Sequence, residues 1–300
     1  MNKLPEKIWA FFRGIILIGV GFIIMYPIIY MVSCAFRESA DMNDPSVMWL
    51  PKHFTLDVIK DTIKAMDFGN TLKNTLFLNV GCSVVQVISC AVTGYGFARF
   101  DFVGKKFLFA FVIMMILVPP QVISLPLYTQ FMNFGAGMFR VNLIDSIFTM
   151  YLPAVTANGL KSGLMILIFR QFFRGLPKEL EDSAYIDGCS PLRTFVEIML
   201  PNALPAVLTV FLFSVVIYWN DYYTSSVFFR NTKTLALVLE NLDNELKKNL
   251  FGSAEVQISQ REQIVWKEAG CLISITPLLV MYVFLQKYFT AGIEHSGLVM

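Results

Sequence analysis

The side chains that most often perform catalysis are sparse in this sequence. It has two histidines, His53 and His295, and neither lies in an H-E-x-x-H or other metal-ligand spacing. No G-x-S-x-G nucleophile elbow is present. The run 104–106 (GKK) lacks the upstream glycine and the Ser/Thr of a phosphate-binding P-loop. We therefore predict no catalytic residue, metal site or cofactor in this chain, and any work driven by ATP requires a nucleotide held by another chain.

A short polar stretch near residue 220 has side chains that could bind a ligand. Asp221 follows Trp219 and Asn220 at the end of an apolar run. An aromatic ring beside an amide and a carboxylate suits a sugar, which needs stacking and hydrogen bonds to its hydroxyls. The rival interpretation, which we prefer at this stage, is an interfacial aromatic belt, because residues 218–223 are rich in Tyr and Trp.

A second ionisable group, Lys161, lies within an apolar run and is by default a functional candidate. It is flanked by Gly159 and Gly163, a small-xxx-small pattern that suits close helix packing. The lysine marks either a break in a helix or a charge buried in the membrane, and we favour the break.

The elements that must position these residues are membrane helices. The chain is 56% hydrophobic and 15% charged, whereas a soluble domain is about 45–50% apolar and about 25% charged. The excess falls into long runs with almost no charge, each at least the roughly 18 residues that a crossing helix needs. We predict an all-α membrane protein with one transmembrane domain over residues 1–300. Its six predicted spans are 14–36, 74–98, 107–128, 146–172, 203–229 and 269–289.

Prolines interrupt several of these apolar runs. In lipid, the backbone groups that a proline frees are tolerated only where protein or a water-filled cavity satisfies them. Any one proline is a simple kink, but together they indicate broken helices beside a cavity. The prolines concerned are Pro27, Pro119, Pro120, Pro126, Pro153, Pro205 and Pro277.

Basic residues in the short loops predict the orientation. Residues 99–106 and 170–193 carry seven Lys and Arg between them, and the connection around Arg140 carries one. The positive-inside rule therefore places those two loops and both termini in the cytoplasm. Loops 37–73 and 230–268 then lie outside, and the second is either a solvated loop or a surface for a partner.

Acidic residues gather in one polar segment between two apolar runs. Residues 179–201 read ELEDSAYIDGCSPLRTFVEIMLP. Acids at its start favour a helix N-terminus, Gly188 predicts a helix stop, and Ser190 with Pro191 predicts the cap and first turn of a second helix. Each helix has an apolar stripe. The stripes either lie on the membrane or on the chain's own helix ends, or they dock in the groove of a partner.

The same segment resembles the EAA loop of ABC-importer permeases. Asp182-Ser183-Ala184 stands where E-A-A would, Asp187-Gly188 follows at the family's spacing, and 198–201 (IMLP) matches I-x-L-P. Further similarities occur in order along nearly the whole chain: 95–100 (YGFARF), 119–122 (PPQV), 126–128 (PLY), 172–180 (FFRGLPKEL) and 219–221 (WND). Together they are similar to the carbohydrate-importer branch in its MalG-like half. Asp for Glu and Ser for Ala are departures from the motif, and Ser is the poorer helix former.

The resemblance implies a mechanism. It implies a bacterial plasma-membrane permease that pairs with a second homologous permease. It also implies that two cytoplasmic ATPase subunits hold ATP and Mg²⁺, so that this chain needs no nucleotide site of its own. An extracellular solute-binding protein delivers a carbohydrate. The predicted coupling loop is 176–200. Its predicted ATPase-coupling residues are Leu180, Asp182, Ser183, Ala184, Asp187, Gly188, Leu192 and Phe195. The predicted translocation-path residues are Gln121, Trp219, Asn220 and Asp221.

Three other functions are alternatives to this one. A permease for another small solute shares every feature above. An ATP-independent carrier or channel usually shows inverted internal repeats, which we do not see. A membrane-embedded enzyme needs clustered acid and base residues at the membrane face, and none are apparent.

Overall fold

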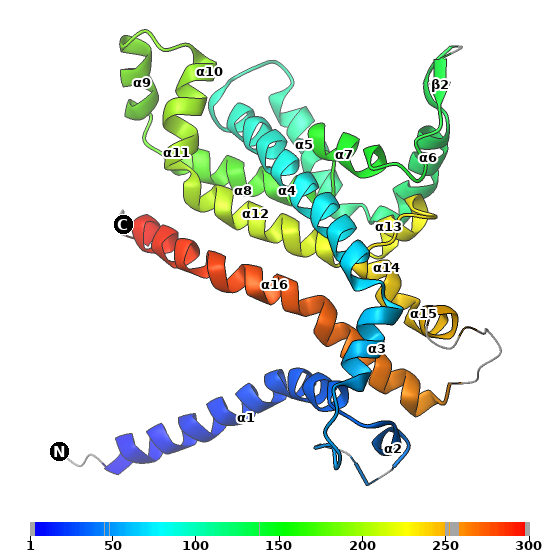
Figure 1. The fold of residues 1–300 in the computed structure, drawn as a ribbon. Helices are drawn as coiled ribbons and strands as arrows, with labels where there is room; N and C mark the ends of the chain where they lie inside the picture. The colour runs from blue at the N-terminus through cyan, green and yellow to red at the C-terminus, as the bar shows by residue number, and fades with distance from the viewer. Residues whose placement is uncertain are drawn as a thin grey trace. The chain divides into compact units, whose positions relative to one another are not determined.

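The computed structural model describes residues 4–297, apart from residues 45, 48, 138, 250–251 and 253–257 (Figure 1). The chain forms two compact units. The first comprises Met1–Phe68 with Val238–Pro277, and the second comprises Gly69–Leu237 with Leu278–Met300. Both are built mainly from helices.

The first unit contains two long helices and several short ones. Its elements are α1 (Leu4–Ala35), α2 (Ser39–Met42), α3 (Asp57–Ala65), α15 (Leu242–Asn249) and α16 (Gln260–Gly297) as far as Pro277. Helix α15 packs on α3, and its apolar face is fully buried through Leu242 and Leu246. The buried carboxylate of Asp41, in α2, accepts the backbone N–H groups of Lys52 and His53 at 2.7 and 2.8 Å. Both donors lie in the loop between α2 and α3.

The second unit contains the remaining elements. They are α4 (Phe68–Arg99), α5 (Lys105–Leu117), α6 (Pro120–Met132), β1 (Phe134–Ala136), β2 (Phe139–Val141), α7 (Phe148–Val155), α8 (Ser162–Gly175), α9 (Glu179–Ile186), α10 (Pro191–Thr194), η1 (Phe195–Met199), α11 (Leu200–Asn202), α12 (Leu204–Trp219), α13 (Tyr223–Phe228) and α14 (Leu235–Glu240), which ends in the first unit. Helix α8 packs against both α5 and α12. Strands β1 and β2 pair antiparallel with Gly135 opposite Arg140, and they form the connection that precedes α7.

Helix α4 shows how a membrane helix packs inside this unit. Its buried face carries small and polar residues, whereas large apolar side chains such as Phe77 and Ile88, each 60% exposed, point outward. That is the pattern expected when lipid solvates the apolar face and small residues allow helices to approach closely. Gly94 is one such contact, because an added Cβ would lie 2.6 Å from the Cβ of Phe169 on α8. Gly163 is another, since its Cβ would lie 2.7 Å from the carbonyl oxygen of Val112 on α5.

The loop before α7 and the loop after α13 are held together by one carboxylate. Asp145 accepts the backbone N–H groups of Arg230, Asn231 and Thr232 at 3.0 to 3.2 Å. Burial alone would raise the pKa of Asp145, but these hydrogen bonds outweigh it, and the pKa lies below its ordinary value. Asp145 is thus a fixed negative charge whose partners are backbone N–H groups and the side-chain amide of Asn231, which donates at 2.6 Å.

Three predicted spans match long apolar helices. Within the described residues, Trp9–Ala35, Phe68–Arg99 and Gln260–Gln286 are long and apolar enough to cross a membrane. Two bent helix pairs bring the number to five if each pair is one span. The predicted number of six is therefore not reached by continuous helices, and the start of α16 at Gln260 shows that the predicted outer loop 230–268 ends in a helix.

The other three predicted spans are not single helices. In 107–128, Pro119 and Pro120 lack N–H groups, and α5 and α6 meet at 105°. In 146–172, Ala157 and Lys161 adopt left-handed conformations, so residues 156–161 separate α7 from α8. In 203–229, α12 ends at Trp219 and α13 begins at Tyr223.

Candidate functional site

The acidic segment forms the two helices that the sequence predicts, joined at Gly188. Helix α9 ends at Ile186, Gly188 has φ +81°, and the N–H of Cys189 donates to the carbonyl of Ala184 at 2.9 Å. That bond, with a left-handed glycine, is typical of a Schellman motif. The predicted cap of the second helix is also present, because Ser190 Oγ accepts the N–H of Arg193 at 3.4 Å.

The second helix differs from the prediction in one respect. After one turn, α10 passes into the π-helical turn η1, which continues into α11. Phe195 and Met199 of this turn are buried, with 6% and 0% of their surfaces exposed. π-Helical turns are rare and often lie at functional sites. No sequence signal that we used distinguishes such a turn from an ordinary α-helix.

The buried stripe of the segment packs on the core of its own unit. Ala184 and Phe195 are 2% and 6% exposed, and Leu180 packs against the same core cluster from a partly buried position. The Phe195 ring contacts Tyr95 of α4 at 4.9 Å between centroids. The stripes therefore cover the unit's own helix ends, so Leu180, Ala184 and Phe195 hold the segment in place.

A buried ion pair fixes the segment to the end of α4. Glu181 Oε2 lies 3.2 Å from Arg99 Nε, and both side chains are less than 10% exposed. Tyr95 donates its hydroxyl to the other oxygen of Glu181 at 2.7 Å, and Arg99 donates through Nη2 to the carbonyl of Leu176 at 2.7 Å. The two charges thus neutralise each other inside the protein. Neither Glu181 nor Arg99 was among the predicted site residues, although both lie in motifs that resemble those of the family.

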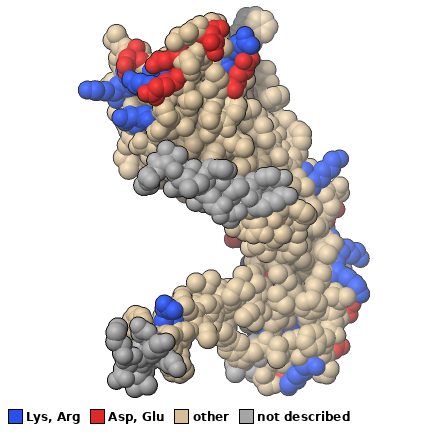
Figure 2. All heavy atoms as spheres, turned by 90° about the vertical axis from the view of Figure 1, so that its left-hand side faces the viewer, with Lys and Arg blue, Asp and Glu red and all other residues tan. Residues whose placement is uncertain are grey.

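The opposite face of the segment is exposed. Ile186 and Leu192 are 85% and 72% exposed, and Val196 is 51% exposed. Of the predicted coupling residues, Asp182, Ser183, Asp187, Gly188 and Leu192 lie on this exposed side. Figure 2 shows charged side chains of both signs gathered at the end of the unit that carries α9 and α10. The outer face of the segment thus presents apolar side chains among charged ones, while its inner face is fixed to the core by packing and by the Arg99–Glu181 ion pair.

The predicted path residues do not form one group. Trp219 is 5% exposed, whereas Asn220 is exposed and donates through Nδ2 to the carbonyl of Val216 at 2.8 Å. Asp221 accepts the N–H groups of Thr224 and Ser225 at 3.1 and 3.0 Å and so caps α13. Gln121 lies exposed in the first turn of α6.

A cavity of about 460 Å³ lies in the second unit where its broken helices meet. Its wall is mostly apolar, with Met114, Val118 and Phe228 among the lining residues. Polar side chains from the helices and from the break at 156–161 complete the lining: Ser124, Gln130, Thr149, Asn158, Lys161, Ser162, Tyr218, Tyr223 and Thr224. A mostly apolar cavity with a few placed polar groups is typical of a small-molecule site. Of the ionisable groups that we singled out, Lys161 lines the cavity and Asp221 does not.

The break at 156–161 is stabilised by side chains from α4. Gln86, which is fully buried, donates through Nε2 to the carbonyl of Leu160 at 2.8 Å and accepts the hydroxyl of Tyr218 at 2.6 Å. Ser89 donates to the carbonyl of Ala154 at 2.6 Å. These bonds satisfy backbone groups that the break leaves without helix partners, as the membrane interior requires. Gln86 and Ser89 were missed at the sequence level, where a glutamine within an uncharged run was the available signal.

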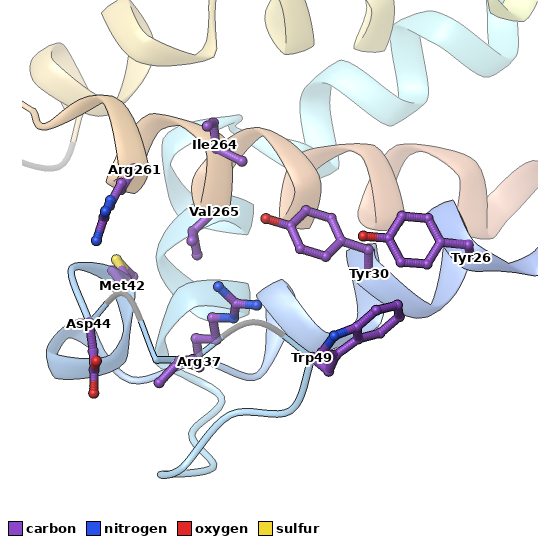
Figure 3. A pocket seen from close by; sticks show the side chains of 10 residues that line it. Tyr26, Tyr30, Arg37, Met42, Asp44, Trp49, Arg261, Ile264 and Val265 are labelled. Atoms are coloured by element: carbon purple, nitrogen blue, oxygen red, sulfur yellow. The ribbon is translucent and has the colours of Figure 1, made fainter.

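The first unit has a separate cavity of about 380 Å³ (Figure 3). Tyr26 and Tyr30 of α1 stack with their ring centroids 6.2 Å apart, and Trp49 meets Tyr26 edge-on at 5.1 Å. The Arg37 guanidinium lies 5.6 Å from the Tyr30 ring centroid, within cation–π range. Arg261 donates to the carbonyl of Asn43 at 3.0 Å. This wall is aromatic and basic, but its arginines already have partners inside the protein.

Comparison with known proteins decides the family. A family model described as "Binding-protein-dependent transport system inner membrane component" matches residues 91–295, which is more than half of the chain. The chain belongs to this family. It is therefore a permease of the ABC-importer type and a membrane protein of a transport system, as the resemblance of its EAA-like segment implied.

Relatives of this permease have named substrates. The chain is 26% identical over 300 residues to the "Arabinooligosaccharides transport system permease protein AraQ" of Halalkalibacterium halodurans, and the match covers 99% of both chains. It is 26% identical over 287 residues to the "Polygalacturonan/rhamnogalacturonan transport system permease protein YtcP" of Bacillus subtilis, with 91% of this chain and 93% of the relative covered.

The fold of the permease also matches a solved structure. That structure is a bacterial ABC transporter involved in the import of the acidic polysaccharide alginate. The TM-score is 0.74 at 19% sequence identity, and the match covers 96% of this chain and 99% of that chain. At this identity the likeness establishes the shared fold.

Proposed function

We propose that this permease forms part of the translocation path for a carbohydrate and that a solute-binding protein outside the cell delivers it. Two relatives that match nearly the whole chain are named for arabinooligosaccharides and for polygalacturonan or rhamnogalacturonan. Both names denote saccharides, which supports a carbohydrate over another small solute. They differ in charge, because the second polymer carries carboxylates.

The observation that carries the proposal is the two-faced segment α9–η1. Its inner face is fixed by the Arg99–Glu181 pair, and its outer face exposes Ile186 and Leu192. Exposed apolar side chains on a helix that its own unit supports suit insertion in a partner's groove. We propose that this outer face docks in a cytoplasmic ATPase subunit, with Asp182, Ser183, Asp187, Gly188 and Leu192 at or beside the contact.

The remaining subunits follow from the same mechanism. The sequence has no phosphate-binding loop, so ATP and Mg²⁺ are held by two partner ATPases. Closure of the ATPase dimer moves the docked segment, and the ion pair transmits that movement to α4. A second homologous permease completes the path. In this arrangement both termini and residues 176–200 lie in the cytoplasm, as the basic residues of the short loops predict.

Site-directed cross-linking tests the docking face. In a Cys189→Ser background, we expect Ile186→Cys to cross-link to the ATPase in membranes of cells that express the whole importer. Ala184→Cys is the matched control, because it lies on the same helix but is 2% exposed. Equal cross-linking of both positions, or of neither in a complex that hydrolyses ATP, contradicts the docking face.

Uptake assays test the transport function itself. Cells that lack this gene are expected to lose ATP-dependent uptake of at least one member of a panel of neutral and acidic oligosaccharides, and the restored gene should return it. Uptake that persists after ATP depletion would instead indicate an autonomous carrier or channel. Loss of a non-sugar solute alone would contradict the carbohydrate assignment while leaving the transport role in place.

A further inference from the structure

The cavity of the second unit has one charged residue in its wall. Of the residues that line it, Lys161 alone carries a formal charge at neutral pH. The side chain of Lys161 is exposed and forms no ion pair with any acid among the described residues, and the residue lies in a predicted membrane segment. A charged group in such a segment requires a partner, and an unpaired one marks a ligand or ion path.

Lys161 lies at a break in the backbone, directly before the N-terminus of α8. Lys161 has φ +57°, a conformation that costs free energy for a residue with a side chain, and it immediately precedes the first turn of α8. The N-terminus of this 14-residue helix adds a partial positive charge at the same position in the chain. In transporters, the N-termini of broken helices commonly face the anionic groups of a substrate.

Further polar side chains in the wall of this cavity have no hydrogen-bond partner within the described part of the chain. The side chains of Asn158 and Gln130 are exposed and make no hydrogen bond within the described part of the chain. Ser162 is 1% exposed, and its Oγ is a buried hydroxyl without a partner there. A buried polar atom without a partner is costly, and a bound ligand is one way to satisfy it.

We propose that this cavity binds an acidic saccharide, one that carries uronic-acid carboxylates, and that Lys161 binds the carboxylate. The inference rests on the proposed carbohydrate function and specifies its substrate class. Asn158 and Gln130 are placed to bond sugar hydroxyls, and the ring of Tyr223 offers an apolar face for a pyranose. Lys161 is therefore a specificity-determining residue that a neutral sugar would leave without a counter-ion.

Uptake of two matched sugars by the whole importer tests the proposal. The probes are trigalacturonate and the same trisaccharide with its carboxylates reduced to hydroxymethyl groups. We expect Lys161→Met to lower uptake of trigalacturonate roughly tenfold or more, because it removes a charge-assisted contact. Lys161→Arg keeps the charge and should retain most of the uptake. Direct titration of the purified importer with trigalacturonate, without the binding protein, should show the same order.

The outcomes separate this inference from the proposed function. If the unmodified importer takes up only the neutral trisaccharide, or if Lys161→Met lowers both probes equally, the acidic-substrate inference is wrong and the carbohydrate function stands. If it takes up neither probe nor any other saccharide, the carbohydrate function itself fails. Membrane levels of each variant and ATP hydrolysis stimulated by the binding protein serve as controls for folding.

Discussion

Two cations of the second unit lie in opposite electrostatic surroundings. Arg99 is buried beside Glu181 at 3.2 Å and donates to the carbonyl of Leu176. Lys161 lines a cavity and has no acidic partner in the described part of the chain. A cation that the protein itself neutralises connects elements, whereas one that it leaves unpaired is available for a ligand. The difference separates the proposed coupling region, residues 176–200 with Arg99, from the proposed binding region, the cavity around Lys161.

The largest effect should come from a substitution of Gly188, which connects α9 and α10 in the proposed coupling region. Gly188→Pro is expected to abolish uptake and uncouple ATP hydrolysis, because proline is restricted to φ near −65° and Gly188 has φ +81°. It also removes the N–H that donates to the carbonyl of Tyr185 at 3.1 Å. Gly188→Asn is the control, since asparagine tolerates the left-handed conformation. Normal uptake by the proline variant would argue strongly against the docking role.

Breaking the internal ion pair should come next. Arg99→Met leaves the buried Glu181 carboxylate unpaired, which typically costs about 3–5 kcal/mol. We expect a large fall in thermal stability in detergent and loss of coupled ATP hydrolysis. Arg99→Met with Glu181→Leu should recover much of the stability, because an apolar pair of similar volume often replaces a buried ion pair at little cost. An equally unstable double variant would show that the charges have another role.

The next prediction concerns Gln86, a buried uncharged residue that is bonded to the break containing Lys161. Gln86→Leu leaves the Tyr218 hydroxyl and the Leu160 carbonyl without their partner, at a cost of about 1–3 kcal/mol for each group. The expected result is a lower melting temperature with saccharide selectivity unchanged, since Gln86 supports the break whereas Lys161 is the residue that we propose to bind the saccharide. A change of selectivity without loss of stability would place Gln86 in the binding region instead.

The smallest effect concerns Asp145, a charge held by hydrogen bonds from backbone N–H groups and the Asn231 side chain. Because its folded-state pKa is below the ordinary value of about 4, its stabilisation is complete above that value and is lost as the pH falls through the folded-state pKa. Asp145→Asn should therefore lower the melting temperature by about 2–4 °C at pH 7, and the difference from the unmodified protein should vanish at low pH. Asp101→Asn, at a side chain 98% exposed, is the control and should show no such difference.

Much of the secondary structure of the proposed coupling region could be predicted from the sequence, because the residues that start and stop its helices act locally. Gly188 as a stop, Ser190 as a cap and Pro191 as a first turn each act within a few residues, and all three stand as predicted. The partners of the apolar stripes could not be predicted, since they lie far along the chain. Arg99 and Glu181 are 82 positions apart, by their residue numbers. Only the tertiary structure shows that Ala184 is buried against the core and that Ile186 is exposed.

The sequence by itself determined that this is a membrane permease, because long uncharged runs and an ordered set of motifs do not depend on how helices pack. Only the tertiary structure decided which predicted spans are broken and what lies at the breaks. Proline and glycine indicate that a helix can break, but whether it does depends on remote partners such as Gln86 that satisfy the freed backbone. The same dependence on distant contacts is why Asp221 became a helix cap and Lys161 the charged residue of the cavity.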